Sequence, residues 1–176
     1  MTIRSTALIS ILALLLGAWD ASAVSFLPGW LMGFRLMIPA IVALTIFSSR
    51  RVGLLAAVVG GCVTSLLFAS SGGWIPLRYV ICVMLVYELS HRIITNRSLF
   101  GVMTLAGIAA LADWLLAFLF HWLTSFFTRG INPEAHGPIL AEIVWSAFVV
   151  GIVFIVIAAF TRRFLPTVSP YSGRRR

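Results

Sequence analysis

Six long hydrophobic stretches follow one another along this chain of 176 residues, and they leave no segment long enough for a water-soluble domain. They cover residues 5–24, 30–47, 52–68, 74–87, 98–120 and 138–160. Hydrophobic residues make up 61% of the sequence and charged residues 10%, which is far from the averages of soluble domains. An apolar bilayer thickness of about 30 Å requires roughly 20 helical residues, a length that these stretches reach or approach.

The stretches lack the strict alternation of barrel strands, and backbone polar groups in lipid must be paired within their own element. We therefore predict an all-α fold, a polytopic membrane protein with six transmembrane helices in one bundle. The bundle would occupy residues 1–160 and a basic cytoplasmic tail residues 161–176.

The arginines fall on alternate sides of the hydrophobic stretches. Ten of the thirteen basic residues, all arginines, lie before the first stretch or after the second, fourth and sixth, while the opposite connections carry only Arg129. The positive-inside rule then places both termini in the cytoplasm. As an alternative, Arg4 and the run ending in Ala21-Ser22-Ala23 are also typical of a secretory signal whose cleavage would leave five spans.

The net charge of +8 belongs mostly to arginines beside the spans, so it indicates contact with membrane lipids and does not predict binding to nucleic acid. The arginines predicted to contact lipid are Arg50, Arg51, Arg162, Arg163, Arg174, Arg175 and Arg176.

The third stretch carries small residues at every fourth position, a spacing that lets helix backbones approach closely in lipid. One row comprises Gly53, Ala57, Gly61 and Ser65, and a second comprises Ala56, Gly60 and Thr64. We predict a helix-packing face here, used within the bundle in preference to a partner protein.

Five ionisable residues lie inside the hydrophobic stretches at a similar distance from their outer ends, about four to seven residues deep. They are Asp20, Arg35, Arg78, Asp113 and Glu142. Any of them alone would be costly in lipid, so a buried, mutually neutralising layer is the favoured hypothesis, with snorkelling to the headgroups as its alternative. Such a layer would hold the bundle, orient a partner or line a binding site.

No catalytic motif accompanies this layer. The sequence contains no phosphate-binding glycine loop, no H-E-x-x-H and no G-x-S-x-G, so we expect neither an enzyme nor a cofactor. His121, Glu134 and His136 surround an outward loop predicted over residues 124–137, but they lack metal-ligand spacing on a defined element, and no metal site is predicted.

Over residues 26–164 the order of local motifs resembles the rod-shape-determining MreD family. The motifs are Gly33-Phe34-Arg35, Ser48-Ser49-Arg50-Arg51, the glycine-rich segment 59–67, the turn Ser70-Ser71-Gly72-Gly73 and Ala112-Asp113-Trp114. One departure is Thr64, which stands where that family usually places an aspartate, so the resemblance does not imply a role that needs this acid.

This resemblance implies a non-enzymatic scaffold of the cell-elongation machinery in the inner membrane. It would contact an MreC-like bitopic protein and, indirectly, MreB filaments and peptidoglycan synthases. The resemblance also implies a six-helix fold shared with the substrate-binding components of energy-coupling-factor vitamin transporters. The alternative function is therefore such a component, with a small polar ligand bound among Trp30, Arg35, Trp74, Arg78, Asp113, Trp114 and Glu142.

Overall fold

The computed structural model describes residues 3–26, 35–67, 73–92, 99–127 and 139–164, and these residues form six helices and no strand. The helices are α1 (Ile3–Phe26), α2 (Met37–Phe47), α3 (Arg50–Leu67), α4 (Ile75–Arg92), α5 (Leu99–Phe127) and α6 (Ile139–Phe164). The prediction of an all-α chain is confirmed for this part of the sequence.

Three of the described helices are long and apolar enough to cross a membrane. These segments are Arg50–Leu67, Leu99–Ser125 and Ile139–Ala159, and two shorter apolar segments cover Thr6–Ser22 and Met37–Phe47. Large apolar side chains such as Leu66, Phe100 and Leu140 are more than 70% exposed on the surface of the bundle. Exposed apolar surface on this scale is typical of helices that contact lipid, and it supports membrane association.

The short helix α2 lies at the centre of the molecule and contacts each of the other five helices. Its sequence is apolar on nearly all sides, which is typical of a helix buried in a protein core or in a membrane. Met37, Ile38, Ile41 and Val42 are accordingly almost fully buried. With 11 residues, α2 is about 16 Å long, roughly half the apolar thickness of a bilayer.

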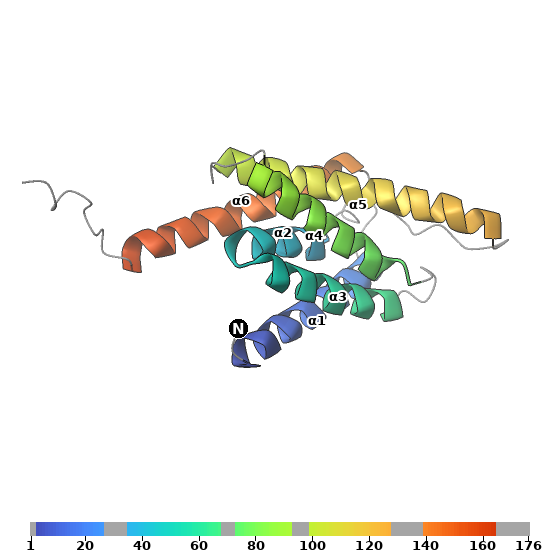
Figure 1. Cartoon of the computed structure of the whole chain (residues 1–176), viewed down its shortest axis with the longest axis horizontal. Coiled ribbons are helices and arrows are strands. Elements are labelled where there is room, and N and C mark those ends of the chain that lie inside the picture. Colours follow the sequence, from blue (N-terminus) through green and yellow to red (C-terminus); the bar gives the residue numbers. More distant parts are fainter. Residues whose placement is uncertain (1–2, 27–34, 68–72, 93–98, 128–138, 165–176) are drawn as a thin grey trace, which may run out of the picture.

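The remaining helices surround α2 in two groups. In Figure 1, α5 and α6 run side by side, and α1 lies on the opposite side of the molecule against α3. Helix α4 connects the groups, because it contacts both α3 and α5. Charged residues from different helices can therefore meet around α2.

Two helix boundaries differ from the sequence prediction. The second helix begins at Met37, so Arg35 lies just before α2 and not within the helix. The fifth helix continues to Phe127, which makes residues 124–127 helical although we predicted them as part of a loop. Thr124 supports this extension, because its hydroxyl donates to the Phe120 and His121 carbonyls of its own helix, at 2.9 and 3.0 Å.

Candidate functional site: a buried charged layer

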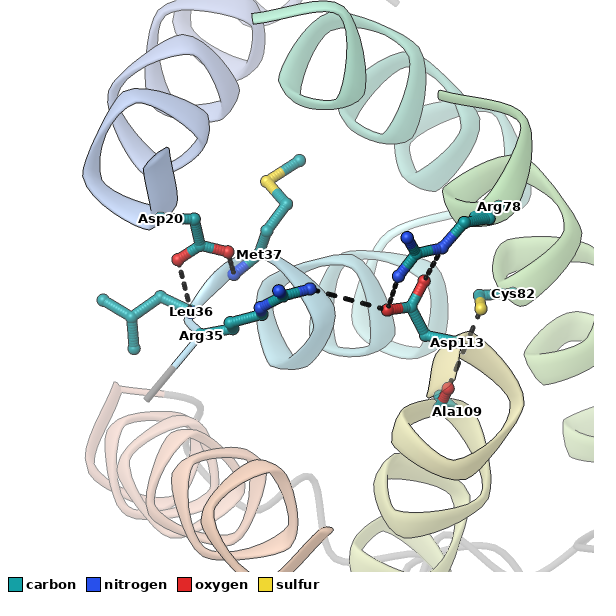
Figure 2. A network of polar contacts seen from close by, with 8 residues as sticks. All are labelled: Asp20, Arg35, Leu36, Met37, Arg78, Cys82, Ala109 and Asp113. Carbon is teal, nitrogen blue, oxygen red and sulfur yellow. Dashed lines mark hydrogen bonds and ion pairs between the residues drawn. The ribbon is translucent and has the colours of Figure 1, made fainter. Parts of the chain in front are cut away.

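The centre of the site is a bidentate ion pair between α4 and α5. Arg78 donates from Nε to Oδ1 of Asp113 at 3.1 Å and from a terminal nitrogen to Oδ2 at 2.6 Å (Figure 2). Both side chains are almost completely buried, at 3% and 1% exposure. Two parallel charge-assisted hydrogen bonds fix the mutual orientation of the two side chains, so this pair joins α4 to α5.

Arg35 reaches the same carboxylate from the opposite side. Its guanidinium lies 4.0 Å from Oδ2 of Asp113, which is beyond hydrogen-bond distance, and its side chain is 11% exposed. Figure 2 shows it extending from the start of α2 toward Asp113. Asp113 therefore lies between two arginines. Arg78 is hydrogen-bonded to it, and Arg35 lies beyond hydrogen-bond distance.

Asp20 is buried in the same region but has a different role. Its carboxylate oxygens accept hydrogen bonds from the backbone N–H groups of Leu36 and Met37, at 2.7 and 2.9 Å. The first N–H groups of a helix have no partner within the helix, and Leu36, which precedes α2, supplies no side-chain cap. An aspartate from α1 thus caps α2, where the partial positive charge of the helix N-terminus also favours an anion.

Glu142 is the last member of the predicted set, and it differs from the others in its hydrogen bonding. It is 2% exposed in the first turn of α6, and its Oε1 atom has no hydrogen-bond partner among the described residues. Ser146, one helical turn later, is 1% exposed, and its hydroxyl is also unpaired within that part of the chain. Arg35 carries the opposite charge, and the two residues act on each other electrostatically.

All five predicted residues are thus placed in one region, but only Arg78 and Asp113 are directly bonded to each other. The predicted depth of Asp113 was wrong relative to its helix end, because α5 continues fourteen positions beyond it to Phe127. Ser146 was not among the predicted residues, although its spacing of four from Glu142 places it on the same helix face.

The small-residue rows of α3 pack against helices of the same chain. A side-chain carbon added at Gly53 would meet Thr45 of α2, and one added at Gly61 would lie 2.6 Å from the Pro76 backbone of α4. Ala57 is fully buried and Ser65 is partly buried. In the second row, Thr64 donates to the Gly17 carbonyl of α1 at 3.3 Å and to a carbonyl of its own helix.

The arginines at the start of α3 are exposed, as a headgroup contact requires. The Arg50 guanidinium lies 5.1 Å from the centre of the Tyr87 ring of α4, within the range of a cation–π interaction. The side chains of Arg162 and Arg163 and the residues Arg174, Arg175 and Arg176 lie outside the described residues.

Two described tryptophans of the alternative ligand site contact phenylalanines on α5. Trp74 stacks on Phe120 with ring centres 4.9 Å apart, and Trp114 stacks on Phe118 at 6.1 Å. Trp30 lies outside the described residues, as do Glu134 and His136 of the outward loop. The described residues contain no group of three or more side chains suited to binding a metal ion.

Comparisons with protein-family models, with curated proteins and with solved structures found no match to this chain.

Proposed function

We propose that the chain is a non-enzymatic scaffold of the bacterial cell-elongation machinery, built as a six-helix bundle in the inner membrane with both termini in the cytoplasm. The resemblance to the MreD family supports this function. The alternation of arginines along the sequence supports the orientation. In this proposal the first helix is retained, because Asp20 caps α2 and Gly17 packs on α3.

The observation that carries the proposal is that the buried charged side chains connect the helices to one another. Arg78 and Asp113 pair with each other, and Asp20 holds the start of α2, so these side chains fix the positions of four helices. A rigid bundle with apolar outer faces suits a protein whose role is to hold partners in place. The proposed partners are membrane lipids, an MreC-like bitopic protein and, indirectly, MreB filaments and peptidoglycan synthases.

Affinity purification from gently solubilised membranes tests the scaffold function. We expect the tagged chain to recover an MreC-like bitopic protein, and we expect its depletion to make rod-shaped cells round. The Asp113→Asn variant should recover less of this partner. The matched control, Glu88→Gln, alters an exposed carboxylate paired with Arg92 within α4 and should leave recovery unchanged.

A second candidate function is a substrate-binding component of a vitamin transporter. The unpaired buried Glu142 and Ser146 favour it, because groups of this kind remain available to a ligand. Recovery of ATPase subunits together with a transmembrane coupling protein, and of no morphogenesis partner, would establish this candidate and exclude the scaffold.

A further inference from the structure

We propose that Arg35, Glu142 and Ser146 form a binding site for the head group of a small zwitterionic amino acid. The guanidinium would bind the ligand's carboxylate, and Glu142 Oε1 would accept a hydrogen bond from its ammonium group. The inference rests on the second candidate function, the substrate-binding component, and names the class of its ligand. The same site would also suit a scaffold that responds to a small molecule.

The first step of the argument is the unused hydrogen-bonding capacity. A guanidinium has five N–H donors, yet the ion pair of Arg35 within the described residues is the 4.0 Å approach to Asp113. Glu142 Oε1 and the Ser146 hydroxyl are unpaired over the same part of the chain although both side chains are almost fully buried. Buried polar groups normally have partners, so Glu142 and Ser146 indicate a missing one, and the partly exposed guanidinium of Arg35 keeps donors for it.

The second step is that the three groups belong to one place. Glu142, Ser146 and Val150 recur at every fourth position of α6 and are all buried, so they share the face that α6 turns to the bundle. Helices α2 and α6 are in contact, and Arg35 immediately precedes α2. Arg35 and Glu142 carry opposite charges and act on each other electrostatically.

The third step is charge. A simple cation at Glu142 would be repelled by Arg35, and a simple anion at Arg35 would be repelled by Glu142. A zwitterion satisfies both residues and adds no net charge to the buried layer, where an unpaired charge is costly. Arginine also matches the planar geometry of a carboxylate, which it can bind with two parallel hydrogen bonds.

The test uses the full-length chain in lipid nanodiscs with glycine as the probe. We expect glycine to raise the melting temperature in a concentration-dependent manner, because a ligand that binds only the folded state stabilises it. Acetate and methylammonium each carry one of the two charges and should produce a much smaller shift at the same concentration. Equal shifts with all three compounds, or no shift with glycine, would overturn the proposal and leave ordered water as the occupant.

Variants assign the effect to the site. Glu142→Gln removes the charge that faces the ammonium group and should weaken the apparent glycine affinity by about tenfold or more. Ser146→Ala is a milder change that should weaken it less while leaving the fold intact. Glu88→Gln, at an exposed carboxylate, is the matched control and should bind as the unaltered chain does. Undiminished glycine binding in both site variants would contradict the assignment. This assay contains no partner protein. A negative result therefore rejects the ligand site alone, whereas the affinity purification tests the scaffold function.

Discussion

Asp113 is the residue on which the charged layer depends, because it is bonded to Arg78 and faces Arg35 as well. Removing one member of a buried ion pair leaves an uncompensated charge, which costs far more than the pair itself contributes. A neutral residue at this position therefore distinguishes a buried ion pair from an aspartate whose side chain only snorkels to the headgroups.

We expect Asp113→Asn to destabilise the bundle by about 3 kcal/mol, since Arg78 would keep its charge without a countercharge in direct contact. The measurement is the melting curve in detergent. Glu88→Gln should change stability by no more than about 0.5 kcal/mol, because the Glu88–Arg92 pair is largely exposed. A melting curve for Asp113→Asn that matches this control would contradict a structural role for the pair.

Asp20 gives a second prediction at the same scale. Asp20→Ala leaves the N–H groups of Leu36 and Met37 without their acceptor, and loss of a helix cap costs about 1–2 kcal/mol. Hydrogen exchange at the first turn of α2 should become faster in this variant. Ser22→Ala is a close control, because that exposed hydroxyl bonds only to carbonyls of its own helix. Equal exchange in the two variants would show that Asp20 does not cap α2.

At the scale of the element, the contact between α3 and α4 depends on the absence of a side chain. A carbon added at Gly61 would lie 2.6 Å from the Cα atom of Pro76, and backbone atoms cannot move aside as the end of a flexible side chain can. The two helices would have to separate.

We expect Gly61→Ala to destabilise the chain by about 1–3 kcal/mol, the usual range for overpacking. At Gly107 of α5, an added carbon would meet Ile143 at an ordinary 3.4 Å. Gly107→Ala should therefore be neutral or stabilising, because alanine favours helix by up to about 1 kcal/mol over glycine. Thermal unfolding of both variants in the same detergent provides the comparison, and equal stabilities would contradict the close approach.

The sequence supported those predictions that depend only on the residue pattern within a single helix. Charges inside apolar runs identified the five residues of the layer, and the four-residue spacing identified both packing rows of α3. It could not identify Arg78 as the partner of Asp113, because that choice depends on how α4 and α5 are rotated about their axes. The start of α2 at Met37 was missed for a similar reason, since its cap comes from Asp20 on another helix.

At the scale of the whole molecule, the alternation of arginines along the chain carries a prediction about orientation. Under the proposed topology, reporter fusions after Arg51, after Arg92 and at the carboxyl end should all be active in the cytoplasm, because the positive charges gather on that side. A fusion within residues 128–138 should be active in the periplasm. A periplasmic carboxyl end would contradict the six-span arrangement.

The central position of α2 has a consequence for biosynthesis. This helix takes its cap from α1, which is made before it, and part of its covering from α6, which is made after it. Its surroundings are therefore incomplete while the ribosome is still translating the chain, and folding of the interior must wait until synthesis reaches the sixth helix.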